Sequence, residues 1–164
     1  MRRTGLLMIV AGWLLLAGLI WWVMGGALER QHNPNAELAR VTESAGEIVL
    51  KRGRDGHYRA PGRINGQAVD FLVDTGATQV AIPMDLAQRI GLRPGRAFQA
   101  QTAMGVTVAY TTRLQSVALG GLEMRDIAGT LIANPGSDEV LLGMSFLSHF
   151  EIGIRDGEMT LRAR

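Results

Sequence analysis

The stretch Phe71-Leu72-Val73-Asp74-Thr75-Gly76-Ala77-Thr78 indicates the fold. In it an apolar run ends at Val73 and is followed directly by the acidic residue Asp74. The run begins at Ala68 and is almost wholly apolar, which is typical of a buried strand. An ionised carboxylate is costly to bury alone, so Asp74 needs N–H donors, a second charge or a proton. Gly76 lets the backbone approach that carboxylate closely. The stretch therefore predicts a strand that delivers Asp74 into a tight turn suited to proton transfer, and the alternative is an Asx-type turn that only caps the strand.

Strand-like runs and turn residues alternate on both sides of this stretch. Asn65-Gly66 predicts a two-residue hairpin turn, and Pro83 and Gly91 bracket one helix over residues 84–90. The other predicted strands lie around residues 47–50, 57–60, 63–64, 97–102, 106–113, 114–119, 122–133, 139–142, 151–154 and 159–161. The fold class predicted is an all-β domain with one short helix and about 115 residues, a size that folds alone.

A long apolar segment lies near the start of the chain. Gly5 to Leu28 contains no charged side chain, and 19 of these 24 residues are apolar. As a helix they would measure about 36 Å, enough to cross about 30 Å of hydrocarbon, and they show no polar stripe. The segment predicts a single transmembrane helix. A cleaved signal peptide is the alternative, although its apolar region is usually only about 7–15 residues long.

The charges around this segment predict its orientation. Arg2 and Arg3 precede it, which favours a cytoplasmic N-terminus, and Trp21 and Trp22 suit the far interface. The predicted organisation is a cytoplasmic tip and transmembrane anchor over 1–28, a polar linker over 29–46 and a folded domain over 47–164. In a bacterium the protein would be a single-pass protein of the inner (cytoplasmic) membrane with its domain in the periplasm.

Charge and residue usage argue against several other functions. The chain has 17 basic and 15 acidic residues, and without Arg2 and Arg3 the numbers are equal, so no nucleic-acid partner is predicted. The absence of cysteine excludes disulfides and thiol nucleophiles. The three histidines are far apart in the sequence and lack the spacing of zinc ligands. No metal and no cofactor are therefore predicted.

Two segments resemble the retropepsin-like, single-lobe aspartic proteases. Leu72-Val73-Asp74-Thr75-Gly76-Ala77 is similar to their active-site motif, and Val140-Leu141-Leu142-Gly143 is similar to the segment that packs beside the catalytic loop. The likeness covers roughly residues 57–162, and with the anchor it looks most like a bacterial membrane-anchored branch. It implies a retropepsin-like acid-protease barrel with Asp74 as catalytic residue. The resemblance further implies loop support from Thr75, Gly76 and Ala77, and packing beside the loop by Leu141, Leu142 and Gly143.

The resemblance also implies a second copy of the chain. Aspartic proteases need two carboxylates that share a proton. None of the other aspartates is followed by Thr-Gly or Ser-Gly, so the second carboxylate would be Asp74 of a partner across a two-fold axis. Retroviral members usually have an arginine after Gly143 that ties the dimer together. This chain has Met144 there, so that ion pair is not expected.

Members of the family also cover their substrate with a hairpin flap. The candidate runs from Gln99 to Thr112, with its tip at Ala103, Met104 and Gly105, and an ordinary surface turn is the alternative. The function implied is an aspartic endopeptidase that acts on a protein or peptide substrate as a homodimer. The alternative function is a non-catalytic module that binds a peptide or a partner on the same fold.

Overall fold

The computed structural model describes residues 12–22, 33–37, 46–102, 105–133 and 137–164. The chain divides into two compact units, Met1–His32 and Asn33–Arg164. In the first unit, residues 12–22 form a helix with exposed side chains. Among the described residues, no helix combines the length and the apolar character needed to cross a membrane. Residues 5–11 and 23–28 of the predicted anchor lie outside the described residues.

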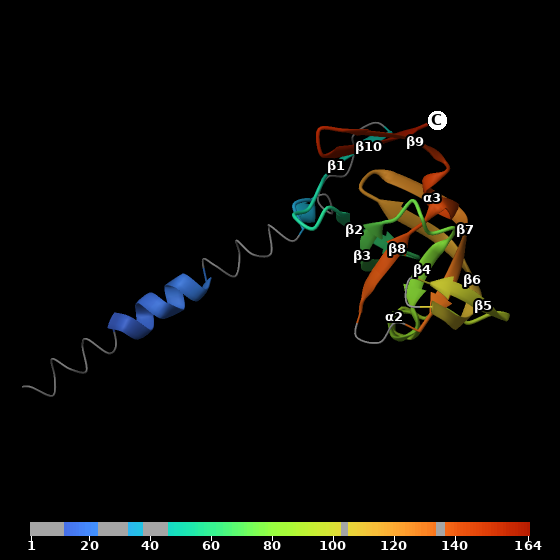
Figure 1. The fold of residues 1–164 in the computed structure, drawn as a ribbon, viewed down its shortest axis with the longest axis horizontal. Coiled ribbons are helices and arrows are strands. Elements are labelled where there is room, and N and C mark those ends of the chain that lie inside the picture. Colours follow the sequence, from blue (N-terminus) through green and yellow to red (C-terminus); the bar gives the residue numbers. More distant parts are fainter. Residues whose placement is uncertain (1–11, 23–32, 38–45, 103–104, 134–136) are drawn as a thin grey trace, which may run out of the picture. The chain divides into compact units, whose positions relative to one another are not determined.

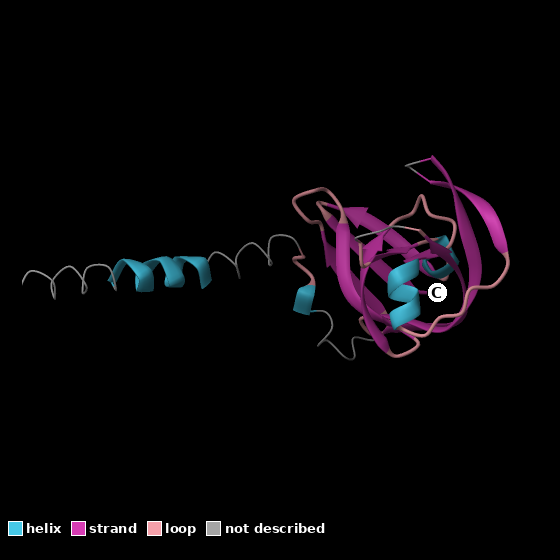
Figure 2. Cartoon of the chain, turned by 90° about the horizontal axis from the view of Figure 1, so that it is seen from below, coloured by secondary structure: helices cyan, strands magenta, loops and turns pink. Residues whose placement is uncertain are grey.

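The second unit is an all-β barrel with short helices (Figure 1). A seven-stranded sheet runs in the order β2-β3-β8-β4-β7-β6-β5 and closes on itself where β2 pairs with β6. The view along the barrel in Figure 2 shows this closure. The described elements are β1 (Glu47–Lys51), β2 (Tyr58–Ile64), β3 (Gln67–Val73), β4 (Val80–Pro83), α2 (Met84–Arg89), β5 (Ala97–Thr102), β6 (Gly105–Leu119), β7 (Leu122–Ile132), β8 (Glu139–Leu142), α3 (Met144–Leu147), β9 (Phe150–Arg155) and β10 (Glu158–Ala163).

Three details of the predicted secondary structure were wrong. The strands predicted at 57–60 and 63–64 form one strand, β2, which continues through Pro61 and Gly62. One short helix was predicted for the domain, but its described part has two, and the second, Met144–Leu147, lies where the family resemblance allows a short helix after Gly143. The break predicted between 113 and 114 is absent, and β6 continues through it for 15 residues. No glycine or proline interrupts the chain at that point, and both halves of β6 pair with the single strand β7.

The predicted turns have the expected backbone geometry. Asn65 and Gly66 both have positive φ angles, 50° and 82°, and join β2 to β3 as a two-residue hairpin turn. Asp156 and Gly157, at 50° and 80°, join β9 to β10 in the same way. Gly91, with a φ of 74°, follows the last residues of α2, where glycine adopts the left-handed conformation without a Cβ penalty.

Side chains from alternate strand positions fill the barrel interior. The largest fully buried ones include Ile64, Phe71, Leu114 and Leu131. Each such side chain stabilises the fold by about 1.5–3 kcal/mol through burial. Closure of the barrel also needs one small residue, since a Cβ on Gly62 would lie 2.4 Å from a backbone oxygen of β6 and 2.5 Å from the Phe71 ring.

A three-stranded antiparallel sheet, β1-β10-β9, lies at the end of the barrel opposite α2 and the β5–β6 hairpin (Figure 1). Its inner face is apolar and buried through Ile48, Leu50, Met159 and Leu161. The sheet joins the first strand of the domain to the last two, so both ends of the domain are fixed at this place.

Asn35, in the segment predicted as a linker, is held on the barrel. It is 5% exposed. Its Nδ2 donates to the carbonyl oxygens of Lys51 (2.9 Å) and Arg59 (2.7 Å), and its Oδ1 accepts the Lys51 N–H (2.7 Å). One amide group thus satisfies three backbone groups of β1 and β2. This part of the predicted linker therefore belongs to the folded unit instead of forming a free tether.

Replacing Asn35 by alanine is expected to lower the free energy of unfolding by about 1–3 kcal/mol, because buried backbone groups would lose their partners. Urea unfolding measures the change. The matched control is Asn33→Ala, since within the described ranges the Asn33 side chain makes a single hydrogen bond, in which it accepts the Asn35 N–H at 3.1 Å, and a smaller loss is expected. Equal losses in the two variants would contradict this role of the Asn35 amide.

Candidate active site

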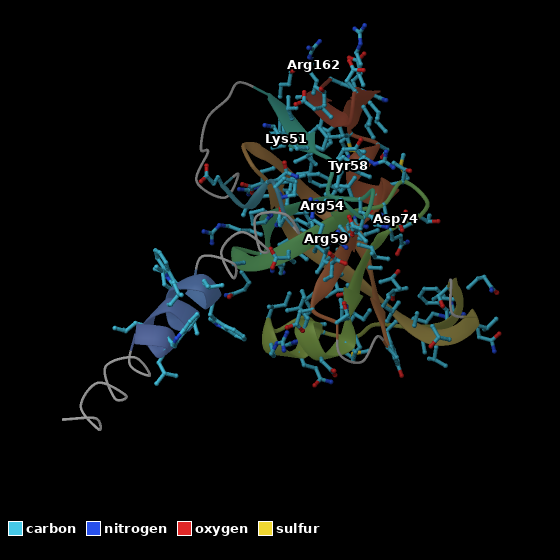
Figure 3. The ribbon with its side chains drawn as sticks, turned by 60° about the vertical axis from the view of Figure 1, so that its left-hand side comes forward. Lys51, Arg54, Tyr58, Arg59, Asp74 and Arg162 are labelled. Carbon is cyan, nitrogen blue, oxygen red and sulfur yellow. The ribbon has the colours of Figure 1, made fainter. Side chains whose placement is uncertain are left out.

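Asp74 follows the last residue of β3 at the point where the neighbouring strand β8 also ends. The two strands run parallel, with Val73 opposite Leu142 and Leu72 opposite Leu141. The Asp74 N–H donates to the Leu142 carbonyl oxygen at 3.2 Å. The predicted packing residues Leu141, Leu142 and Gly143 thus lie beside the start of the Asp74 loop. Figure 3 labels Asp74 together with Tyr58 of β2, which is paired with Val73.

The loop places a donor on the Asp74 carboxylate. The Gly76 N–H donates to Asp74 Oδ1 at 2.8 Å, and the Ala77 N–H donates to the Asp74 carbonyl oxygen at 3.3 Å. This is the hydrogen-bond pattern of an Asx turn. Asp74 is half-buried, while Thr75 and Gly76 are exposed. The carboxylate is therefore fixed by its own loop and still accessible to a second molecule.

Gly143 and the first turn of α3 hold the same loop from the other side. The Met144 N–H donates to the Ala77 carbonyl oxygen at 2.8 Å, and the Ser145 N–H donates to the Thr78 carbonyl oxygen at 3.0 Å. A Cβ on Gly143 would lie only 2.3 Å from the Gln79 carbonyl oxygen and 2.7 Å from that of Ala77. Only glycine lets the two segments approach this closely.

Ser145 is a structural contact of the site that the sequence reading did not identify. Its Oγ accepts the Val80 N–H at 3.0 Å and donates to the Ala128 carbonyl oxygen at 2.8 Å. The hydroxyl thus links α3 to β4 and β7. In the sequence this role is indicated only by the presence of a hydroxyl residue shortly after Gly143. The two partners, Val80 and Ala128, are 65 and 17 positions away from Ser145.

Replacing Ser145 by alanine is expected to lower the free energy of unfolding by about 1–3 kcal/mol, because a part-buried N–H and a carbonyl would lose their partner. The Val80 amide should also exchange its hydrogen faster, since it would no longer be bonded to the Ser145 hydroxyl. Urea unfolding and hydrogen exchange measure the two effects. Ser148→Ala, at an exposed serine just after α3, is the control and should change neither quantity. Unchanged Val80 exchange in Ser145→Ala would refute the link.

The candidate flap is a regular hairpin of β5 and β6. Thr102 of β5 pairs with Gly105 of β6, and Ala103 and Met104 of the predicted tip lie outside the described residues. Val106 and Val108 are 65% and 53% exposed, and no charged residue occurs from Ala97 to Thr112. An exposed apolar patch of this kind is typical of a binding surface. Its role as a flap remains a prediction.

A fixed group of charges lies on β2 and β8, next to β3. Arg59 donates through Nε to Glu139 Oε1 at 2.5 Å and through Nη1 to Asp55. Burial alone would lower the pKa of Arg59, but the hydrogen bonds to Asp55 and Glu139 raise it above its ordinary value. The hydrogen bond from Arg59 lowers the pKa of Asp55, helped by the His57 N–H. These groups are therefore paired ions beside the strand that carries Asp74.

Within the described ranges, no group of three or more histidine, aspartate or glutamate side chains has the arrangement of a metal site. A half-buried Asp74, fixed by one N–H and open to solvent on one side, can hold or release a proton toward a bound molecule.

Residues 60–149, which make up more than half of the chain, match the family described as "gag-polyprotein putative aspartyl protease". This chain belongs to that family. The matched range includes the Asp74 loop, Gly143 and Ser145, the three features that build the site. The resemblance to retropepsin-like aspartic proteases is thereby confirmed.

A solved relative has the same barrel. The crystal structure of a retropepsin-like aspartic protease from Rickettsia conorii is 30% identical and superposes with a TM-score of 0.62, covering 73% of this chain and 93% of that chain. The similarity of the two structures confirms that the barrel of this chain has the predicted retropepsin-like fold.

Two curated relatives are longer than this chain. An uncharacterized protein from Sinorhizobium sp. is 36% identical over 128 residues, which are 74% of this chain and 55% of that protein. An uncharacterized protein from Rickettsia prowazekii (strain Madrid E) is 34% identical over 109 residues, which are 65% of this chain and 46% of that protein. The chain thus spans about half the length of the curated relatives it matches.

Proposed function

We propose that this chain is an aspartic endopeptidase that works as a homodimer, with one Asp74 from each copy in a shared active site. The observation that carries the proposal is the Asp74 carboxylate, held by the Gly76 N–H in a loop that α3 fixes, in a chain of the aspartyl protease family. Such a carboxylate is positioned but not fully buried, as proton transfer to a bound peptide requires.

In this proposal the second carboxylate comes from a second copy, because no other aspartate of this chain is followed by Thr-Gly or Ser-Gly. Asp55, Asp126 and Asp138 are in ion pairs with arginines. Asp70 is exposed on β3, four residues before Asp74, which is about 13 Å along a strand. A two-fold axis between two copies would bring the two Asp74 carboxylates together.

The proposed reaction uses the two carboxylates in opposite protonation states. The ionised Asp74 takes a proton from a water as its oxygen attacks the scissile carbonyl carbon. The protonated Asp74 of the other copy gives its proton to the carbonyl oxygen, which forms a neutral tetrahedral diol. Return of a proton to the amide nitrogen then lets the C–N bond break, leaving a carboxyl group and an amine.

We also propose that the chain is anchored in the inner membrane with its protease domain in the periplasm. The support is the apolar segment from Gly5 to Leu28 and the positive charge of Arg2 and Arg3 in front of it. Anchoring two copies on one membrane face would raise their effective concentration and favour the dimer.

Cleavage of a peptide library tests the activity. The preparation should begin at Asn33, so that Asn35 keeps its contacts with β1 and β2, and the Asp74→Asn variant serves as control. Cleavage at mildly acid pH by the wild type alone supports the endopeptidase. If neither protein cleaves any peptide at a pH where the barrel stays folded, the chain is instead a binding module on the same fold.

A further inference from the structure

A cavity of about 500 Å³ lies where the β5–β6 hairpin leaves the barrel. Its walls come from four segments of the chain: the end of the Asp74 loop at Gln79, the α2–β5 loop at residues 93–95, strand β6 at residues 111–113 and strand β7 at residues 128–129. Gln79 is the fifth residue after Asp74, so the cavity borders the candidate active-site loop.

Hydrogen bonds fix the walls of the cavity. The Gly95 N–H donates to the Thr111 carbonyl oxygen at 2.7 Å, and the Arg96 N–H donates to Thr111 Oγ1 at 3.0 Å. The Thr112 hydroxyl donates to the Arg93 carbonyl oxygen at 3.1 Å. A Cβ on Gly95 would lie 2.7 Å from Thr111 Oγ1 and 2.8 Å from the Thr111 carbonyl oxygen, so glycine is needed for this contact. The α2–β5 loop is therefore bound to β6 and does not have to order when a ligand enters.

Both charged residues that line the cavity are arginines. From Leu86 to Leu122 the chain contains four arginines and no acidic residue. Two of them, Arg93 and Arg113, line the cavity, and no aspartate or glutamate does. Arg113 is paired with Asp126, which raises the pKa of the Arg113 guanidinium through their hydrogen bonds. Arg93 is exposed, and its guanidinium has no ion pair within the part of the chain that the structure describes.

Gln79 adds a neutral donor to this positive lining. Its Oε1 accepts the hydroxyl of Thr130 at 2.7 Å, which fixes the side chain and leaves its amide NH₂ to donate elsewhere. A guanidinium beside an amide donor suits a carboxylate, because both groups donate and the charge is complementary.

We propose that this cavity binds the side-chain carboxylate of an acidic residue in the peptide substrate. The inference rests on the proposed endopeptidase function and adds a specificity to it. Five residues of chain span at most about 18 Å, so Gln79 lies within that distance of Asp74. An extended peptide advances about 3.3 Å per residue, which places the acidic residue within about five positions of the scissile bond.

A binding experiment tests the cavity without any use of catalysis. N-acetylglutamate N-methylamide is titrated into the full-length chain while the amide NMR signals of Gly95 and Thr111 are followed. We expect saturable shifts in the wild type and in Arg96→Gln, whose arginine lies in the same loop but does not line the cavity. We expect none in Arg93→Gln. Equal shifts with the neutral N-acetylglutamine N-methylamide would overturn the recognition of a carboxylate.

Cleavage of matched peptides tests whether the carboxylate belongs to the substrate. Peptides that differ by one Glu-to-Gln exchange, at each position within five of the cut, are compared by kcat/KM. The wild type should prefer one glutamate peptide by about threefold to tenfold, mostly through KM, because a partly exposed charge pair contributes modestly. The Arg93→Gln variant should lose the preference and Arg96→Gln should keep it.

The two experiments separate this proposal from the proposed function. If no peptide is cleaved but N-acetylglutamate N-methylamide still binds through Arg93, the endopeptidase function fails and the carboxylate site stands as a site for a free anion. If peptides are cleaved without any glutamate preference, the substrate specificity is overturned while the protease is supported. Absence of both binding and preference overturns the site itself.

Discussion

Replacing Asp74 by asparagine is expected to reduce kcat/KM for peptide cleavage by at least about 10²–10⁴-fold, the usual contribution of a general acid–base group. Asparagine has nearly the same shape, and its Oδ1 can still accept the Gly76 N–H that is 2.8 Å from Asp74 Oδ1. The loop should therefore keep its structure while the proton-transferring group is lost. The measurement is initial cleavage rate, with urea unfolding to show that the variant is folded.

The matched control is Asp70→Asn, an aspartate of the same strand that is exposed and four residues away. It should keep wild-type activity, because its carboxylate is too far along β3 to join the pair. Equal loss of activity in the two variants would mean that charge on this strand matters and not the acid at position 74. Full activity of Asp74→Asn would overturn the proposed catalytic role.

Mixing wild-type and Asp74→Asn chains tests the shared site. If each active site needs two Asp74 residues and the copies exchange freely, an equal mixture forms about one quarter wild-type dimers, by random pairing. The activity of the mixture should therefore be about one quarter of the activity of wild-type chain alone, measured at the same total chain concentration. A value near one half would mean that each copy acts by itself, and the homodimer would be refuted.

Features set by neighbouring residues could be predicted from the sequence. The Asn65-Gly66 turn requires two positive φ angles, and this dipeptide adopts them easily. The apolar run before Asp74 predicted the strand that delivers it, although the structure buries only one face of that strand, through Val69, Phe71 and Val73, and leaves Asp70 exposed. For the same local reason Gly91 marked the end of α2.

Features that depend on distant partners were not predictable from the pattern alone. Ser145 bonds to β4 and β7, and a serine in a short helix carries no sign of either contact. Asn35 lies in a polar segment that resembles a linker, and only the folded chain shows its amide against Lys51 and Arg59. The place of β8 beside β3 came from a family resemblance, because a parallel pairing 69 residues apart leaves no local signal.

Among substitutions at positions other than Asp74, Gly143→Ala is expected to have the largest effect on the structure of the candidate active site. The added Cβ would lie 2.3 Å from the Gln79 carbonyl oxygen and 2.7 Å from that of Ala77, and both atoms belong to the backbone of the Asp74 loop. Backbone cannot rotate away as a side chain can, so the loop must move. We expect the free energy of unfolding to fall by about 3 kcal/mol, at the upper end of the cost of overpacking.

The consequence for the active site follows from the hydrogen bonds at the same place. The Met144 and Ser145 N–H groups bond to the carbonyl oxygens of Ala77 and Thr78, so a displaced loop would lose these contacts and the position of Asp74 with them. Peptide cleavage should therefore fall by more than the folded fraction does. Urea unfolding and cleavage rate, measured on the same preparation, separate the two effects.

The matched control is Gly153→Ala in β9, where an added Cβ meets no atom within 4 Å and the residue is exposed. That variant should unfold within about 0.5 kcal/mol of the wild type, as a surface substitution does, and cleave normally. If Gly143→Ala behaved like Gly153→Ala, the close packing of the two segments would not be what holds Asp74. The position of the carboxylate would then depend on the Gly76 N–H and the turn of the loop alone, as in a simple Asx turn.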